Sequence, residues 1–517
     1  MGTDSLKYDF VIVGGGPAGL SAALRLAQLN SAFSIAIIEK AADIGSHSLS
    51  GAILQADSLT ELLPDWQNAK FATKVTTEEL LFLTKTKQYK LPIPRAMQNH
   101  GNFIIRLGDL CQHLAQVATA HNIDIFTQTA VSDFIINTNN ELAGVKTKAM
   151  GVTKDGKEGP QFSPSINIYA KKTIVADGAA SPFSRKIIEH FKLETGQASY
   201  GLGIKEVWQI DKNQHSTGKI THTIGFPLGN KIFGGGFLYH LPNNLLAVGL
   251  ITSLDYQNPH LNPHNEMQML KTHNKLCHYF AKGKRLAYGA RVINEGGYQS
   301  IPKVAFPGGV LVGCSASLVD NIKLKGIHNA IKSGKLAAEC LATEFLQEST
   351  ISHSYIQRLN TSVGAELKKA KNIKAGFRYG IIPGMLLAGV HLITKGREPW
   401  EWQNNNNNFN STQTYKDISY PKPDNKINFD RASSVFATNS MHTTDQPNHI
   451  SLNTNKLTSQ EKLGATNFCP ANVYSLEDNK LKLQPDNCIH CQTCAIKIAN
   501  LKWSPPQGGD GPNYEEI

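Results

Sequence analysis

The N-terminal part of the chain combines two different hydrophobic patterns. Residues 8–14 alternate into a buried strand, residues 17–29 carry apolar side chains at helical spacing, and residues 34–40 form a second apolar strand. A strand, a helix and another strand in this order predict a βαβ unit with two parallel neighbouring strands. We therefore expect an α/β fold that begins with a Rossmann-like unit.

Glycines occupy the turn between the first strand and the helix, in the pattern GxGxxG. In this pattern the first glycine makes the tight turn, the second lets the backbone approach a pyrophosphate, and the third allows close helix packing. The phosphates would lie at the positive end of the helix, and a carboxylate at the end of the second strand can accept from ribose hydroxyls. A glycine turn without a ligand is the alternative. The predicted dinucleotide site comprises Val11, Gly14, Gly15, Gly16, Pro17, Ala18, Gly19 and Glu39.

The motif alone does not decide between FAD and NAD, but the rest of the chain favours FAD. No second strand–GxGxxG–helix unit occurs, because "FGGGF" (233–237) is flanked by strand-like sequence. Residues 171–185 predict a strand that ends in Asp177 and Gly178, which is common in flavoprotein folds. A later strand is followed by a long amphipathic helix near 326–346, whose N-terminus could face a flavin ring.

Three cysteines, Cys488, Cys491 and Cys494, lie at strict three-residue spacing near the end of the chain. Ferredoxins commonly complete such a CxxCxxC run with a thiolate from a remote Cys-Pro, and Cys469 precedes a proline upstream. Zinc usually takes paired CxxC knuckles, so one 4Fe-4S cluster fits the spacing better than zinc, and free thiols are a third alternative. We therefore predict these four cysteines as metal ligands.

Composition narrows the class of protein. The chain has 517 residues, of which 41% are hydrophobic and 18% charged, so two or three folded domains are expected. Its net charge of +11 favours an acidic partner or an anionic membrane surface. No basic run is interleaved with aromatic residues, so we expect no nucleic-acid partner. Eight cysteines are too few for a disulfide scaffold and indicate a reducing compartment.

Two segments in the second half of the chain have unusual composition. Residues 380–393 are nearly all apolar and have basic flanks, but they are shorter than the roughly 20 residues of a spanning helix. They predict either a buried core helix or a helix in the membrane interface. The asparagine tract 404–408 predicts a surface loop or linker that has drifted in sequence. The first strand begins almost at once, so we expect no signal or transit peptide.

Motifs along nearly the whole chain resemble those of the electron-transfer flavoprotein–ubiquinone oxidoreductase family. They are "GSHSLSGA", "NHGNFIIRLGDL", "FLYHL", "LDYQNPHL", "KRLAYGAR", "NEGGYQSIPK", "REPW", "YPKPD", "DQPNHI", "CPANVY", "CIHCQTC" and "GGDGPNY". The resemblance implies an enzyme with FAD and one 4Fe-4S cluster. It would take electrons one at a time from reduced electron-transfer flavoprotein and pass them through the cluster and FAD to ubiquinone, forming ubiquinol.

The resemblance also implies residues at the quinone and the flavin. Gly234 and Gly235 match a glycine pair that holds the quinone ring, where a backbone without Cβ can approach a flat ring. A β-bulge without a ligand is the alternative. Asn329 matches a side chain at the reactive edge of the flavin. Phe233 and Gly236 stand where the family often has Tyr and Ser, so polar contacts to the quinone are expected to differ.

Three further residues carry roles by resemblance. Arg106 matches a contact to the flavin phosphates. Tyr474 and Thr493 match hydroxyls that bond near the cluster and raise its potential, with ordinary loop hydrogen bonding as the alternative.

We expect three regions in the chain. The FAD-binding domain comprises 1–200 and 291–400 and includes membrane-interface segments 44–65 and 380–393. An inserted mixed β-sheet at 201–290 binds ubiquinone, and 401–517 form a ferredoxin-like 4Fe-4S domain. The resemblance implies a monotopic protein on the cytoplasmic face of a bacterial inner membrane, or the matrix face of the mitochondrial one. The competing interpretations are a geranylgeranyl-reductase-like flavin oxidoreductase and a non-catalytic electron-carrier module.

Overall fold

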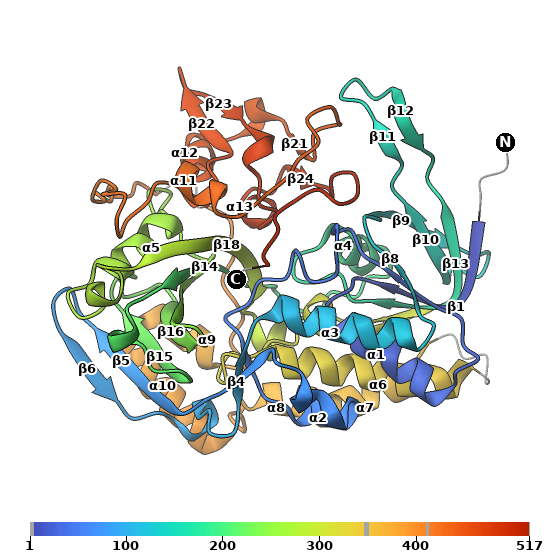
Figure 1. Ribbon diagram of the computed structural model, residues 1–517, viewed down its shortest axis with the longest axis horizontal. Helices are drawn as coiled ribbons and strands as arrows, with labels where there is room; N and C mark the ends of the chain where they lie inside the picture. Colours follow the sequence, from blue (N-terminus) through green and yellow to red (C-terminus); the bar gives the residue numbers. More distant parts are fainter. Residues whose placement is uncertain (1–4, 346–350, 410–412, 516) are drawn as a thin grey trace.

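The computed structural model describes residues 5–345, 351–409, 413–515 and 517 (Figure 1). A sheet with a parallel centre and covering helices, a second sheet and a C-terminal region above both make up the molecule in this view. Smaller elements connect these parts. They are β3 (Ile53–Leu54), β4 (Ala72–Lys74), β7 (Phe103–Ile105), β11 (Met150–Val152), β12 (Glu158–Ser163), α4 (Pro182–His190), α7 (His353–Leu359), α8 (Ala365–Lys368) and α9 (Ile373–Gly376).

The first sheet contains the βαβ unit that the sequence predicts. Its central strand, β1, pairs in parallel with β2 on one side and with β13 on the other. Strand β2 is a continuous apolar run, and the last four residues of β13 are buried, as expected where helices cover both faces of the sheet. The elements are β1 (Ser5–Val13), α1 (Pro17–Leu29), β2 (Ile35–Ile38), α3 (Leu107–Ala120), β8 (Asp124–Phe126), β9 (Val131–Ile136), β10 (Leu142–Thr147), β13 (Asn167–Val175), β19 (Ala305–Phe306), β20 (Gly309–Leu311) and α6 (Ile327–Phe345).

Helices α1 and α6 pack against each other at a glycine. A Cβ on Gly334 of α6 would lie 2.2 Å from the carbonyl oxygen of Ala18 in α1, so the two helix backbones touch. Pro17 opens α1, where a missing N–H removes no helical hydrogen bond. This contact brings the N-termini of both helices to the same edge of the sheet, beyond β1 and β20.

The second sheet has seven strands and is mixed, as predicted. All of its neighbours are antiparallel except β15 and β5, which are parallel. Helix α5 (Pro263–Thr272) packs on this sheet. The strands, in spatial order, are β18 (Lys284–Asn294), β14 (Tyr200–Gln209), β17 (Leu245–Ser253), β16 (Gly234–Leu241), β15 (Lys219–Gly225), β5 (Thr77–Leu83) and β6 (Gln88–Leu91).

One predicted domain border is wrong. The sequence interpretation gave all of residues 1–200 to the FAD-binding domain, but β5 and β6 lie at the edge of the second sheet. The reason is the parallel register between β5 and β15, which pairs Leu80 with His222. Pairing between strands so far apart in the chain leaves no local pattern, so the border could not be read from the sequence.

The C-terminal region shares its core with the second sheet. Its Phe468 and Trp503 belong to one hydrophobic cluster with Leu202 and Trp208 of β14. Helix α12 begins with a capping box between Thr458 and Glu461, which satisfies its first free amides. The elements are α11 (Arg431–Phe436), β21 (Ile450–Leu452), α12 (Ser459–Phe468), β22 (Tyr474–Glu477), β23 (Lys480–Leu483), α13 (Thr493–Lys497) and β24 (Leu501–Trp503).

The asparagine tract is a loop, as predicted, but it is not wholly at the surface. Asn404 donates to the carbonyl oxygens of Gln197 (2.9 Å) and Gly296 (3.1 Å), and Asn407 donates to that of Ala198 (3.0 Å). Asn407 is only 4% exposed. The tract therefore lies across the segments that precede β14 and follow β18, and its side-chain amides donate to backbone carbonyl groups there.

The apolar segment forms α10 (Ile381–Thr394), and its outer face lies in solvent. Ile382, Leu386 and Ile393 are 63%, 70% and 82% exposed, so the buried core-helix alternative is wrong. No helix in the described ranges has both the length and the apolar content to cross a membrane.

Segment 44–65 differs from α10 in this respect. It contains β3 and α2 (Asp57–Leu62), and Leu59 and Leu62 of α2 are buried in the core of the first domain. Leu49 and Leu63 of this segment are only partly buried, and its contact with a membrane stays a prediction.

Candidate cofactor and cluster site

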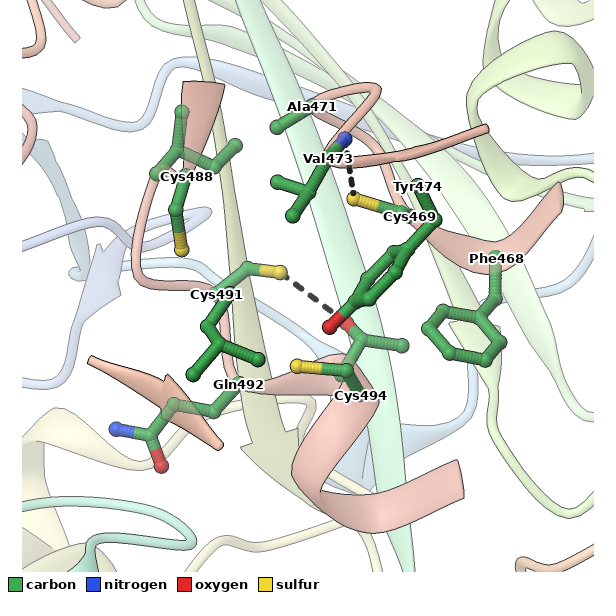
Figure 2. A pocket seen from close by; sticks show the side chains of 12 residues that line it. Phe468, Cys469, Ala471, Val473, Tyr474, Cys488, Cys491, Gln492 and Cys494 are labelled. Atoms are coloured by element: carbon green, nitrogen blue, oxygen red, sulfur yellow. Dashed lines mark hydrogen bonds between the residues drawn. The ribbon is translucent and has the colours of Figure 1, made fainter. Parts of the chain in front are cut away.

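The four predicted cluster ligands converge on one buried pocket (Figure 2). Cys469 directly follows α12, Cys488 and Cys491 lie on the loop before α13, and Cys494 lies on α13. All four are buried, and none forms a disulfide. Apolar side chains complete most of the wall. The lining residues besides the cysteines are Ile450, Phe468, Ala471, Val473, Tyr474, Ile489, Gln492 and Thr493.

The ligand loop is bent by two left-handed residues. His490 and Gln492 have φ of 55° and 67°, which few non-glycine residues adopt. The bends turn the sulfur atoms toward the same space, as Figure 2 shows. The amide of Val473 points at Cys469 Sγ (3.5 Å), and such amides favour negative charge on sulfur.

The four thiols of the pocket need bound positive charge to ionise. Burial raises the pKa of Cys491 to about 11 and that of Cys494 to about 12, and it raises the pKa of Cys469 and Cys488 as well. A neutral thiol does not bind a metal ion, because the thiolate is the form that acts as a ligand. Only bound positive charge can ionise them together, and four thiolates are the ligand set of an iron–sulfur cubane.

Two hydroxyls lie beside these sulfurs. Thr493 Oγ1 is 3.4 Å from Cys491 Sγ. Tyr474 is buried, and its hydroxyl has no hydrogen-bond partner among the described residues. Burial, followed by the charge of Cys494, raises the pKa of Tyr474 well above its ordinary value. The phenol therefore stays protonated and can donate to a sulfur of a bound cluster.

The glycines of the nucleotide turn have different physical reasons. Gly14 has φ of 109°, and a Cβ there would lie 2.4 Å from the carbonyl oxygen of Ala176. A Cβ on Gly19 would lie 2.1 Å from the carbonyl oxygen of Gly14. Gly16, in contrast, has nothing within 4 Å of a Cβ position. Gly14 and Gly19 are thus needed by the fold, whereas Gly16 faces a cradle that a phosphate can fill.

Glu39 is held in place by the same turn. Its Oε2 accepts from the amide of Gly15 and its Oε1 from that of Ala41, both at 2.8 Å. Each carboxylate oxygen keeps a free lone pair, so the group can still accept from a ribose. Val11 is fully buried in β1, and Ala18 is buried in α1, so any contact of theirs with a cofactor is through the backbone.

Asp177 and Gly178 follow β13 and face a serine beyond β20. Ser315 Oγ donates to Asp177 Oδ1 (2.8 Å) and accepts from the amide of Gly178 (3.0 Å). Burial raises the pKa of Asp177. Asn329, in the first turn of α6, is fully buried; its Nδ2 donates to Leu318 while its Oδ1 has no partner among the described residues. A free buried amide oxygen fits a ligand that donates, as a flavin ring does.

Contacts within the protein can account for residues that were predicted to bind the flavin phosphates and the quinone. Arg106 caps α3, and its guanidinium pairs with Asp109 (2.7 Å) and donates to the Glu515 carbonyl (3.1 Å). A Cβ on Gly234 would lie 2.2 Å from the Ile251 carbonyl oxygen, and one on Gly235 would lie 2.3 Å from that of Thr223. Close strand packing alone therefore requires both glycines, although the register of β16 with its neighbours shows no β-bulge there, and their role toward a quinone stays a prediction.

Strand β18 connects the two sites. The amide of Val292 donates to the carbonyl oxygen of Cys491 (3.1 Å), and Arg291 Nη1 donates to that of His490 (3.3 Å). The other terminal nitrogen of Arg291 lies 3.8 Å from the Cβ position of Gly178. One side chain thus spans from the flavin-side turn to the cluster loop.

A group of histidines beside the cluster pocket was missed by sequence reasoning. His442, His449 and His490 contact one another, and His490 also contacts His47 from the first domain. Burial lowers the pKa of His449 to about 3 and holds that of His47 and His490 well below the ordinary value. A signal was present, since "GSHSLSGA", "DQPNHI" and "CIHCQTC" each contain one of these histidines.

Two of these histidines form a donor set with a cysteine. The ligand atoms of His449, Cys488 and His490 lie within 4.8 Å of one another. This set shares Cys488 with the four-cysteine pocket, so the same sulfur cannot serve both a cubane and a separate zinc site. The four-cysteine set is the more complete, because it supplies every ligand that a cubane needs.

Solved structures resemble the fold. A geranylgeranyl bacteriochlorophyll reductase-like protein from Thermoplasma acidophilum matches with a TM-score of 0.59 and 19% identity, covering 76% of this chain and 92% of that chain. A flavoprotein/dehydrogenase from Cytophaga hutchinsonii matches with a TM-score of 0.52 and 18% identity, covering 72% and 86%. At these identities the likeness establishes the fold alone.

Family models match three parts of the chain. One described as an NAD(P)-binding Rossmann-like domain matches residues 12–63. One described as ETF-QO, ubiquinone-binding, matches residues 200–293, which overlap the second sheet. One described as electron transfer flavoprotein-ubiquinone oxidoreductase, 4Fe-4S, matches residues 425–515 and contains all four cysteines of the pocket.

Curated relatives match almost the entire chain. The mitochondrial electron transfer flavoprotein-ubiquinone oxidoreductase of Caenorhabditis elegans is 40% identical over 99% of this chain and 92% of its own length. Those of Homo sapiens and Arabidopsis thaliana are 39% and 38% identical, over 98% and 99% of this chain and 89% and 84% of their own lengths. The chain therefore belongs to the electron transfer flavoprotein–ubiquinone oxidoreductase family.

Proposed function

We propose that this chain takes electrons from reduced electron-transfer flavoprotein at the cluster pocket and delivers them to ubiquinone beside the FAD site, at the surface of an energy-transducing membrane. As a member of its family the chain is an oxidoreductase that uses FAD and one 4Fe-4S cluster. Reduction of one ubiquinone consumes two electrons from the partner and two protons from water, and yields one ubiquinol.

A single observation carries the proposal. The loop that bears Cys491 hydrogen-bonds to β18, and Arg291 of that strand reaches Gly178 at the end of β13. Strand β18 thus lies between the two proposed cofactor sites, and its Arg291 contacts both. When bound, the cluster supplies a one-electron centre and FAD supplies a store for two electrons, which matches a one-electron donor to a two-electron acceptor.

We assign the chain's residues to these groups as follows. Cys469, Cys488, Cys491 and Cys494 hold the cluster, and Thr493 and Tyr474 donate to its sulfurs. Gly16 and its neighbours in the nucleotide turn bind the pyrophosphate, Glu39 the ribose, and Asn329 the flavin edge. The unfilled space at Gly16 and the free Oδ1 of Asn329 support this assignment.

The membrane would be met by α10. Its exposed Ile382, Leu386 and Ile393 form an apolar face, and basic residues such as Lys395 and Arg397 stand at its end. Burying each of these side chains in the acyl boundary contributes about 1.5–3 kcal/mol, and the basic residues attract anionic headgroups. We propose a monotopic protein on the cytoplasmic face of a bacterial inner membrane, or on the matrix face in a mitochondrion.

The test uses the purified holoprotein. We expect about four iron and four sulfide per FAD, as one cubane requires. Photoreduced electron-transfer flavoprotein should bleach the flavin, and a short-chain ubiquinone should reoxidise it. NADH and NADPH are the control donors, since a reductase of the geranylgeranyl type would accept one of them. Flavin reduction by NADPH and none by the flavoprotein would refute the proposal.

A further inference from the structure

Many large apolar side chains on the described part of the chain are partly exposed, but the most exposed of them lie at two places. Five of them are more than 60% exposed: Ile382, Leu386, Ile393, Phe436 and Met441. The first three form the outer face of α10. The other two, at 88% and 76%, lie at the end of α11 and shortly after it. Apolar groups this exposed usually mark a surface that another molecule covers.

Leu286 of β18, which is 36% exposed, lies near the second group, because α11 and β18 are in contact. Arg285 donates to Ser434 Oγ (2.8 Å), and the amide of Tyr288 donates to the Ala437 carbonyl oxygen (3.1 Å). These bonds flank Leu286 and fix it alongside the segment that ends in Phe436. We call Leu286, Phe436 and Met441 the cluster-side patch.

Hydrogen bonds connect the segment of the patch to residues at the cluster pocket, directly beside Met441 and through one further residue beside Phe436. Met441 precedes His442, whose Nε2 donates to the carbonyl oxygen of Cys488 (2.6 Å). Phe436 precedes Ala437, which binds Tyr288; the hydroxyl of Tyr288 donates to the carbonyl oxygen of Pro470 (3.0 Å), next to Cys469. The patch therefore lies on the outer side of segments that are hydrogen-bonded to the residues around the four sulfurs.

The position of the patch excludes the membrane as its occupant. In Figure 1 α11 lies in the upper part of the molecule with the C-terminal domain, whereas α10 lies in the lower part. A membrane that covers α10 leaves α11 facing the aqueous phase. The flank of the patch is basic, because Lys282 and Lys284 at the start of β18 are exposed. A soluble protein with an apolar contact and an acidic rim fits this surface.

We infer that the cluster-side patch is where reduced electron-transfer flavoprotein docks, an inference that rests on the proposed function. Electron transfer between proteins slows steeply with the distance between centres, so a donor to the cluster must approach the surface of the C-terminal region, where Phe436 and Met441 are exposed. Three apolar side chains suit a short-lived contact, since redox encounters bury less than about 1,200 Å². An exposed Phe is also the kind of residue that dominates such interfaces.

The experiment compares Phe436→Asp and Met441→Asp with Leu29→Asp in the holoprotein. Leu29 is an exposed leucine (44%) at the end of α1, remote from the cluster domain, and serves as the matched control. The KM for photoreduced electron-transfer flavoprotein should rise about tenfold or more in each patch variant, as for loss of an interface hot spot, and stay at the wild-type value in the control. Reoxidation of the reduced flavin by a short-chain ubiquinone, after excess dithionite has been removed, should be unchanged in all three.

Cluster EPR and flavin absorbance establish that each variant retains its cofactors, and Met441→Ser replaces any aspartate variant that does not. An unchanged KM in both patch variants, with an active wild type, would overturn the inference and leave the proposed function intact. So would an unchanged KM together with conversion of a dimer to a monomer, because the patch would then be a contact between copies of this chain. A wild type that accepts no electrons from the flavoprotein would overturn both.

Discussion

The two cofactor sites of this chain are built in opposite ways. The nucleotide turn presents backbone: glycines that the fold requires, a cradle at Gly16, and a carboxylate pinned by two amides. The cluster pocket presents side chains: four buried thiols in an apolar wall that cannot ionise without a metal. One substitution in the nucleotide turn can weaken FAD binding partially, whereas loss of one of the four cysteines should prevent cluster binding altogether. We therefore expect graded effects on FAD binding or stability at the first site and complete loss of the cluster at the second.

The largest effect is expected at the fourth thiolate. Cys469→Ala should abolish the EPR signal of the reduced cluster and lower iron to background while FAD stays bound, because a cubane needs four ligands. Cys340→Ala, another buried cysteine but on α6, is the matched control and should keep the cluster. An intact EPR signal in Cys469→Ala would mean that another residue, such as His449, completes the ligand set.

Gly14→Ala should damage both the fold and FAD binding. Its φ of 109° and the 2.4 Å approach to Ala176 leave no room for a methyl group, so strain of at least about 1–3 kcal/mol is expected. Thermal unfolding should begin several degrees lower, and FAD should be lost on gel filtration. A normal melting curve would show that the turn relaxes without the glycine.

Gly16→Ala should separate ligand binding from stability. The space around Gly16 is open, so the free energy of unfolding should change by less than about 0.5 kcal/mol. The added methyl group enters the phosphate cradle, so the Kd for FAD of the apoprotein should rise about tenfold or more. Fluorescence quenching of free FAD measures it. If FAD binds Gly16→Ala as tightly as wild type, the pyrophosphate lies elsewhere.

The sequence predicted most of the nucleotide turn and the four sulfurs because both are local patterns. The order of strand, glycine turn and helix needs only neighbouring residues, and so does CxxCxxC. What it missed depends on partners far along the chain. Thr77–Leu83 joins the second sheet through β15, and Asn407 is buried against Ala198. The histidines around His490 meet only when the first and last domains pack together.

Leu386→Asp should weaken membrane binding and leave both cofactor sites intact. Removing one exposed leucine from an interfacial face, and adding a negative charge, should lower vesicle binding about tenfold. Co-sedimentation with vesicles that contain anionic lipid measures it. Leu59→Ala in α2 is not a suitable control because Leu59 is buried, so Leu29→Asp serves here too. Equal sedimentation of both variants would remove α10 as the membrane contact.

The smallest effect is expected from a hydroxyl beside the cluster. Thr493→Ala removes one donor 3.4 Å from Cys491 Sγ. A hydrogen bond of about 1 kcal/mol to the more negative, reduced form corresponds to a fall of roughly 40 mV in a one-electron potential. Redox titration followed by EPR measures it, and the conservative variant Thr493→Ser, which keeps a hydroxyl, should retain the wild-type potential. A rise in potential in Thr493→Ala would contradict the assigned direction of the bond.

The account's central claim is that the cluster lies between the electron donor and FAD. Ubiquinol formation from photoreduced electron-transfer flavoprotein, measured on Cys491→Ala protein that retains its FAD, tests this most directly. The account predicts that ubiquinol formation falls to background although the flavin is still bound and can be reduced by dithionite. Ubiquinol formation at the wild-type rate without a cluster would contradict it.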